Sequence, residues 1–158
     1  MSEPEPIPFS SCETPNILRF TIPGEPKAKQ RARSFQRGSF RGTYTPKETV
    51  NYENHVKACF TAEHPDWTPT EMDVELSVTA FWPPLKSWLK SKKKMAFVVQ
   101  ELIRRHSKPD WDNVGKIISD ALNGIAYRDD SQVTDAHTRK RYSPRPRVEV
   151  EMRLMERQ

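Results

Sequence analysis

The sequence predicts an α+β fold of one domain, in which a four-stranded mixed sheet carries helices on one of its faces. Several short segments alternate between apolar and polar residues, which is the pattern of strands buried on one side. Other segments repeat apolar residues at helical spacing. The segments follow the order strand, helix, strand, helix, helix, strand, strand, which is typical of an α+β domain. The length of 158 residues suits a single core.

Four segments have the alternating pattern of strands. In the clearest of them, apolar residues alternate with polar ones from Met72 to Trp82, and Pro83-Pro84 stops the run because proline cannot continue a central strand. The expected strands are Asn16–Pro23, Met72–Trp82, Gln132–Tyr142 and Arg147–Met155.

Three segments have helical spacing. The first begins with the pattern of a capping box, in which Thr45 caps the helix, Pro46 takes the first helical position and Glu48 reaches back. The third is strongly amphipathic and is closed by Gly124. The expected helices are 45–64, Lys92–Arg105 and Asp112–Asn123.

Two stretches have no hydrophobic period. Residues 1–15 are rich in Pro, Ser and Glu, so we expect a flexible N-terminal tail and a folded domain at 16–158. Gly24–Thr43 contains three glycines and many basic residues. We expect it to form a long mobile loop, and loops of that length are usually functional or disordered.

The composition excludes several classes of protein. No apolar run approaches the roughly 18–20 residues that a membrane span needs, and the N-terminus does not have the pattern of a signal peptide. Cys12 and Cys59 are the only cysteines and do not form a Cys-x-x-Cys motif, so the sequence indicates neither a disulfide framework nor a zinc site. The sequence lacks a phosphate-binding Gly-Lys-Ser/Thr loop. We therefore expect a cytoplasmic protein with neither a membrane partner nor a nucleotide cofactor.

Basic residues are concentrated in three clusters of a chain whose net charge is +5. Each cluster taken singly is compatible with a solvated surface. Three clusters around one acidic centre favour a DNA-binding surface, in which we expect Lys27, Lys29, Arg31 and Arg33 to contact phosphates. The clusters are Lys27, Lys29, Arg31, Arg33, Arg37 and Arg41; Lys86, Lys90, Lys92, Lys93 and Lys94; and Arg139, Lys140, Arg141, Arg145 and Arg147.

Two aspartates follow a proline just before the third expected helix. Pro109 disfavours helical backbone in the residue before it, which keeps the approach to Asp110 extended. In an extended stretch Asp110 and Asp112 point the same way. Two such carboxylates repel each other unless one is protonated or a cation lies between them. Mg²⁺ commonly binds one or two carboxylates together with waters and substrate phosphate.

A second acidic pair, Asp129-Asp130, follows the same helix at a tight turn. Singly, a helix cap explains Asp112 and an ordinary turn explains Asp129-Asp130. Two acidic pairs at the two ends of one short helix favour a metal site instead. Lys116 lies one helical turn after Asp112, so its ammonium group can reach that site.

Two other acidic motifs do not fit. A calcium-binding EF-hand loop starting at Asp110 would place Val114 and Ala121 at positions that need oxygen ligands. The restriction-type nuclease pattern needs an acidic residue two positions before a lysine, and Lys116 and Lys140 are preceded there by Val114 and Thr138.

Three stretches together closely resemble the RusA family of Holliday-junction resolvases, particularly its phage-type members. They are Lys-Pro-Asp-Trp-Asp-Asn-Val-Gly-Lys at 108–116, Asp-Ala-Leu-Asn-Gly at 120–124 and Asp-Asp-Ser-Gln-Val at 129–133. Upstream, the basic run 23–33 with Tyr44-Thr-Pro46 and Tyr52-Glu53 is similar to the family's N-terminal pattern. The resemblance spans roughly residues 17–153, and the basic insert Lys86–Lys94 departs from it.

The resemblance implies a RusA-like fold and an Mg²⁺-dependent homodimer that nicks opposing strands of four-way DNA junctions in recombination and repair. It places the catalytic, metal-binding aspartates at Asp110, Asp112 and Asp130, the active-site lysine at Lys116, and a less critical acidic partner at Asp129. Two alternatives remain open. One is a non-catalytic DNA-binding or packaging accessory protein, and the other is a flap or branched-DNA nuclease without junction preference.

Overall fold

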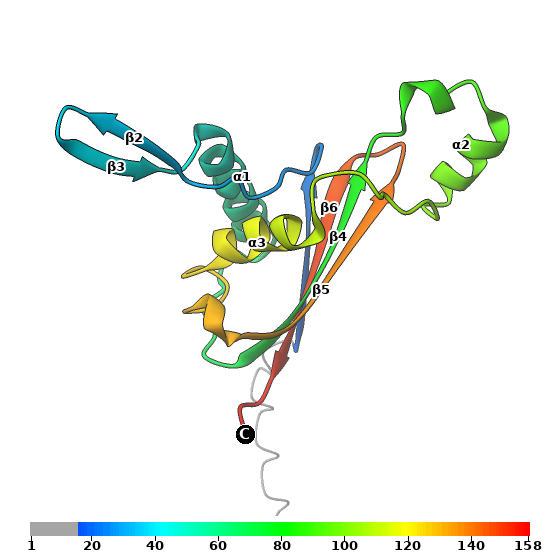
Figure 1. Cartoon of the computed structure of the whole chain (residues 1–158). Helices are drawn as coiled ribbons and strands as arrows, with labels where there is room; N and C mark the ends of the chain where they lie inside the picture. Colours follow the sequence, from blue (N-terminus) through cyan, green and yellow to red (C-terminus); the bar gives the residue numbers. More distant parts are fainter. Residues whose placement is uncertain (1–15) are drawn as a thin grey trace, which may run out of the picture.

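A four-stranded sheet forms the centre of the computed structural model, which describes residues 16–158 (Figure 1). The expected tail at 1–15 lies outside the described residues. The strand order is β1-β6-β4-β5, with β4 and β5 parallel and the other neighbours antiparallel. The predicted mixed sheet is confirmed. Its strands are β1 (Ile17–Pro23), β4 (Asp73–Trp82), β5 (Val133–Tyr142) and β6 (Arg147–Met155).

Helices α1 (Lys47–Glu63) and α3 (Trp111–Leu122) cover one face of this sheet, as predicted (Figure 1). Alternate residues of β1 and β6, such as Phe20 and Val150, point toward the helices and are buried. Most of the intervening residues are polar, and they face away from the helices. From α3, Ile117 and Ile118 complete the core with exposed fractions of 0% and 1%. The apolar side of α3 is therefore buried against the sheet, and its polar side remains accessible for a functional site.

A second, two-stranded sheet corrects the expectation of a loop at Gly24–Thr43. Strands β2 (Arg33–Arg37) and β3 (Phe40–Tyr44) form an antiparallel hairpin that projects beyond α1 and α3 (Figure 1). Gly38 has φ +63° in the two-residue turn, where two-residue hairpins require positive φ. Both sides of the hairpin face solvent, so its strands lack the apolar alternation that identifies a half-buried strand.

The start of α1 also differs from the expected capping box. The helix begins at Lys47 with Pro46 as its cap residue, and no side chain caps it. The Glu48 carboxylate instead accepts a hydrogen bond from Gln30 (3.0 Å) and lies 3.3 Å from the ammonium group of Lys27. Glu48 thus contacts the basic segment before the hairpin instead of the helix end.

The segment between β4 and α3 forms an arm at one end of the sheet, made of a short 3₁₀ turn (Lys86–Trp88) and α2 (Lys92–Val99) (Figure 1). Helix α2 therefore ends six residues before the expected end at Arg105, so the predicted helix Lys92–Arg105 was too long. The chain turns at Glu101, which has φ +59°. It then runs beside the edge strand β5, where the amide of Arg105 donates to the carbonyl oxygen of Lys140 (3.0 Å). Pairing with β5 replaces the last helical turns.

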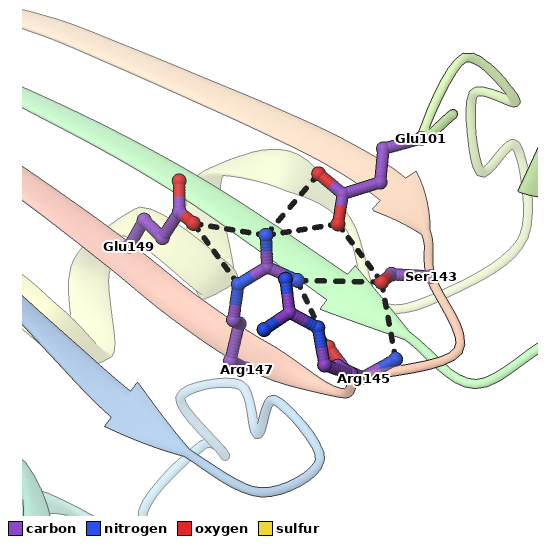
Figure 2. A network of polar contacts seen from close by, with 5 residues as sticks. All are labelled: Glu101, Ser143, Arg145, Arg147 and Glu149. Atoms are coloured by element: carbon purple, nitrogen blue, oxygen red, sulfur yellow. Dashed lines mark hydrogen bonds and ion pairs between the residues drawn. The ribbon is translucent and has the colours of Figure 1, made fainter. Parts of the chain in front are cut away.

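A polar network holds the end of this arm against the sheet (Figure 2). The Arg147 guanidinium lies 2.9 Å from both Glu101 and Glu149, and its side chain is only 14% exposed. Glu101 also accepts a hydrogen bond from the Ser143 hydroxyl (3.0 Å). Arg147 packs over the Phe81 ring, 4.1 Å from its centroid. The same contacts hold the turn of the chain at Glu101, just after the end of α2.

None of the helices within residues 16–158 is both long and apolar enough to cross a membrane.

Candidate active site

Helix α3 carries acidic residues at its start. Asp110 is the cap residue, with extended backbone (φ −69°, ψ 149°) and no capping hydrogen bond from its side chain, and Asp112 lies in the first turn. The helix begins at Trp111, one residue earlier than expected. The expectation that Asp110 and Asp112 lie in one extended stretch and point the same way is therefore wrong. Successive helical residues are turned by about 100°, so the two carboxylates open onto neighbouring hollows.

The first hollow lies between α3 and the strands β4 and β5. It has a volume of about 290 Å³ and contains Asp112, Lys116, Asp120 and Asp130 on its rim; we call it the carboxylate hollow. Its depth depends on Gly115, where a Cβ atom would lie 2.7 Å from the Thr138 hydroxyl oxygen. The absence of a side chain there lets α3 approach β5 closely. Two of the three predicted aspartates and the predicted lysine thus share one open hollow.

The second hollow lies on the other side of the start of α3 and is larger, about 640 Å³. Asp110 and Asn113 line it together with basic residues from two other segments; we call it the basic hollow. Its basic residues are Lys27, Lys29, Arg31, Arg105 and Lys108. The arrangement places Asp110 beside basic groups that attract phosphate. Asp112 and Asp130 line the other hollow, across the start of α3.

Two cations that sequence reasoning did not assign to the site fix the backbone before Asp110. The Lys140 ammonium donates to the carbonyl oxygens of Pro109 (2.6 Å) and Ser107 (2.8 Å). The Arg105 guanidinium donates to the carbonyl oxygen of Lys108 (2.7 and 3.2 Å). Burial lowers the pKa of Lys140 and the positive charge of Arg105 lowers it further, while the charge of Asp110 partly offsets both.

The sequence places Lys140 in the third basic cluster but contains no local sign of this role, because Lys140 and Pro109 lie on separate segments. Only the tertiary fold brings the β5 ammonium group to the carbonyls at 107–109. Lys140 therefore acts on the position of Asp110 through the main chain.

Lys29 is held by two carboxylates. Its ammonium group lies 2.5 Å from Glu53 of α1 and 3.0 Å from Asp120 of α3, with the side chain 23% exposed. Its amide also donates to the carbonyl oxygen of Asn113 (2.9 Å). Burial alone would lower the pKa of Lys29, but the hydrogen bonds and charges of Glu53 and Asp120 raise it above its ordinary value. Lys29 therefore fastens the basic segment to both helices.

The other three residues expected to contact phosphate are more open. Lys27 lies near Glu48, while Arg31 and Arg33 form no ion pair with any of residues 16–158 and are exposed. Arg31 lines the basic hollow beside Asp110, and Arg33 begins the hairpin. These two arginines are the better placed of the four for an external anion.

The two aspartates of the second acidic pair have different surroundings. Asp129 is the cap residue of the short 3₁₀ turn Asp130–Gln132: its carbonyl oxygen accepts from the Gln132 amide (3.1 Å), and its carboxylate accepts from the Ser131 hydroxyl. The Gln132 side chain accepts from the Asp129 amide (2.9 Å) and donates to Thr70 and Met72. Asp130 has no such role and opens onto the carboxylate hollow. Geometry thus distinguishes a capping aspartate from one that faces the hollow.

Tyr127 supports the turn between α3 and Asp130. Its buried hydroxyl donates to the Ser119 carbonyl oxygen (2.6 Å), which ties the turn back to the helix. Burial raises the pKa of Tyr127, the bond to Ser119 lowers it, and the charges of Asp130 and Asp120 raise it further. The tyrosine therefore stays protonated and holds the segment that carries Asp130.

The donor set is suited to a hard cation. Within residues 16–158, no three His, Cys, Asp or Glu side chains already converge as a metal cluster. Asp112 and Asp130 nevertheless share the open carboxylate hollow. One or two carboxylates, completed by waters and substrate phosphate, are enough for Mg²⁺. The residues fit an ion that shares its coordination with a bound phosphate, and they do not form an all-protein cage.

A hollow with carboxylates beside a basic hollow, on a small α+β domain, is the arrangement expected of a protein that acts on phosphate esters of nucleic acid. Comparison with known proteins gives the family. Residues 23–153 match the family described as endodeoxyribonuclease RusA. The chain is also 38% identical over 138 residues to the uncharacterized protein YqaN of Bacillus subtilis (strain 168), covering 87% of this chain and 96% of that protein. The chain belongs to the RusA family, and this membership indicates an endodeoxyribonuclease whose substrate is DNA.

Proposed function

We propose that this protein is an Mg²⁺-dependent endonuclease that resolves four-way DNA junctions by paired strand nicks in recombination and repair. The observation that carries the proposal is the carboxylate hollow, which Asp112, Asp130 and Lys116 line together in a chain of the RusA family. Such a hollow is open enough for a phosphodiester and has the oxygen donors that a hard cation needs.

Asp110, Asp112 and Asp130 are the proposed ligands of Mg²⁺. When bound, Mg²⁺ supplies charge stabilisation at the scissile phosphate and lowers the pKa of the attacking water. Asp112 and Asp130 face the hollow directly. Asp110 adds its carboxylate from the adjoining basic hollow, where Lys140 and its carbonyl contacts hold the backbone in place.

The remaining roles belong to cations. Lys116 is exposed on the rim of the carboxylate hollow, where its ammonium group offsets the negative charge that develops on the phosphate during cleavage. Arg31 and Arg33 bind the phosphates that flank the cut, because they have no carboxylate partner among residues 16–158. Lys27 contributes to the same surface at its edge.

A homodimer follows from the substrate. Two equivalent cuts on opposing strands require two equivalent sites, and a two-fold axis supplies them with one kind of interface. Each protomer in this proposal contains a complete carboxylate hollow, so dimerisation sets the distance between the two cuts and not the chemistry of either.

The test compares a synthetic four-way junction, a flap and a linear duplex, with and without Mg²⁺, for the wild type and Asp112→Asn. We expect paired nicks in the junction only with Mg²⁺, and none with Asp112→Asn. Equal cutting of flap and junction would indicate a branched-DNA nuclease instead. Tight junction binding without any cleavage would indicate a non-catalytic accessory protein and would overturn the proposal.

A further inference from the structure

The two sides of the β2–β3 hairpin differ in chemistry. Residues directly opposite each other in an antiparallel pair share a side. The register pairs Ser34 with Thr43 and Gln36 with Arg41, which makes one side polar. The opposite side carries every aromatic residue of the hairpin, together with two arginines; we call it the aromatic face. Its members are Arg33, Phe35, Arg37, Phe40, Gly42 and Tyr44.

The three rings of the aromatic face form a contiguous surface. The Phe35 centroid lies 6.0 Å from that of Phe40 and 6.2 Å from that of Tyr44. A Cβ atom on Gly42 would lie 2.8 Å from the Phe35 ring, so the missing side chain lets that ring lie across the neighbouring strand. Phe35 thus links the outer rings of Phe40 and Tyr44 into one platform.

The fold does not bury this platform. The exposed fractions are 42% for Phe35, 64% for Phe40 and 48% for Tyr44, and none of the three belongs to the hydrophobic core. The hairpin projects away from α1 and α3 instead of folding back onto them (Figure 1). Contiguous exposed apolar side chains of this kind mark interaction sites.

The charge around the rings indicates the chemistry of the occupant. Residues 26–47 contain no Asp or Glu, and Arg33 and Arg37 lie on the aromatic face itself. A second copy of this face would bring like charges together. An anionic ligand with flat, apolar rings complements it, and nucleic acid is such a ligand. Aromatic side chains with neighbouring cations are the usual platform for unpaired bases, whose phosphates the cations bind.

The hairpin is also anchored beside the site. The segment that leads into it is fastened to α3 by the hydrogen bond from the Lys29 amide to the Asn113 carbonyl oxygen. Arg31, two residues before β2, lines the basic hollow with Asp110. A DNA strand that lies in the basic hollow can therefore continue onto the hairpin.

We infer that the aromatic face of the β2–β3 hairpin stacks on unpaired or unstacked bases at a branch point, while Arg33 and Arg37 hold the adjoining phosphates. The inference rests on the proposed function only in taking DNA as the ligand. It assigns recognition of disrupted base pairing to the hairpin, whereas the carboxylate hollow performs the cleavage.

Phe40→Ala is the first test, because Phe40 is the most exposed of the three rings. Binding is measured in the Asp112→Asn background, so that no DNA is cut, on a duplex with an internal unpaired loop and on the matching full duplex. We expect roughly 5- to 100-fold weaker binding to the looped DNA and little change on the duplex, because one stacked base is lost. Phe40→Trp should keep the preference.

The controls separate stacking from other effects. Phe97→Ala removes an exposed ring (44%) from α2, outside the aromatic face, and should change neither affinity. A 2-aminopurine placed in the unpaired loop should be quenched by the Asp112→Asn protein and by its Phe97→Ala derivative, but not by the Phe40→Ala derivative. The slope of affinity against salt should stay unchanged, since no phosphate contact is removed.

Equal weakening on both DNAs, or no weakening on either, would overturn the inference. So would a Phe40→Ala protein that loses self-association in sedimentation without losing quenching, because the rings would then serve a contact between copies. Failure of the proposed function looks different: the wild type would not nick junctions with Mg²⁺, yet the preference for looped DNA would still depend on Phe40.

Discussion

Lys140 and Pro109 are joined by a 2.6 Å hydrogen bond from the ammonium group to the carbonyl oxygen, which fixes the backbone one residue before Asp110. The bond connects the edge strand β5 to the start of α3. The lysine is half-buried and also donates to Ser107. The Asp110 carbonyl oxygen accepts the first hydrogen bond of the helix, from the Val114 amide (3.2 Å), while the two bonds of Lys140 hold the chain that leads into it.

We therefore expect Lys140→Met to lower the rate constant of junction cleavage by about ten- to a hundredfold, since a misplaced reacting group costs up to that much. Junction affinity should change little, because the ammonium group is occupied by carbonyl oxygens. Single-turnover cleavage and binding assays measure the two separately. Arg139→Ala, on the neighbouring exposed position of β5, is the control and should leave the rate constant unchanged. A loss confined to affinity would mean that Lys140 contacts DNA instead.

The two acidic pairs predict different responses to substitution. Asp110→Asn, Asp112→Asn and Asp130→Asn should each lower cleavage by at least about a hundredfold while junction binding persists, because the variants lose proposed metal ligands and not phosphate contacts. Asp129→Ala should mainly lower the free energy of unfolding, by about 0.5–2 kcal/mol, since Asp129 caps the turn before β5. Cleavage gels and urea denaturation measure these effects. An inactive Asp129→Asn beside an active Asp130→Asn would reverse the assignment.

The parts of the fold that were predictable from the sequence are those with one buried side. Strand β4 and helix α3 repeat their apolar residues at periods of two and 3.6, and both were found within one residue of the expected start. The β2–β3 hairpin has no buried side, and its aromatic residues share one side with two arginines, so neither strand has the apolar alternation of a half-buried strand. Only the turn at Gly38-Ser39 marks it in the sequence.

The residues of the candidate site also differ in whether the sequence alone could predict their roles. The aspartates and Lys116 lie within one short stretch, so local spacing and the family resemblance were enough to propose them as site residues. Lys29 and Lys140 look alike in sequence, as members of basic clusters, but long side chains reach partners that only the tertiary fold supplies. The separation of Asp110 from Asp112 follows from one helical residue, Trp111, which changes the direction of the second carboxylate.

The contact of Lys29 with Glu53 and Asp120 predicts a dependence of stability on pH. The pKa of Lys29 is raised in the folded protein above its ordinary value of 10.5. Its contribution to stability is therefore complete below pH 10.5 and is lost as the pH rises through the raised pKa. Lys29→Met should cost roughly 1–3 kcal/mol at pH 8, and the difference from the wild type should shrink above pH 10.5.

Urea denaturation at several pH values measures this difference. Lys27→Met is the matched control, because Lys27 is more exposed and lies 3.3 Å from a single carboxylate. We expect it to have little effect at any pH, as is usual for exposed ion pairs. A difference that grows with rising pH would contradict the proposed sign.

Arg31 and Arg33 should contribute to DNA binding without contributing to the fold. Both are exposed, and neither has a carboxylate partner among residues 16–158. The double variant Arg31→Ala/Arg33→Ala should weaken junction binding and reduce the slope of log affinity against log salt by about two units, one for each released phosphate contact. Its melting temperature should stay within experimental error of the wild type, whereas Lys29→Ala should lower the melting temperature. Fluorescence anisotropy over a salt titration, together with thermal denaturation, distinguishes these roles. An unchanged slope in the double variant would remove both arginines from the DNA-binding surface.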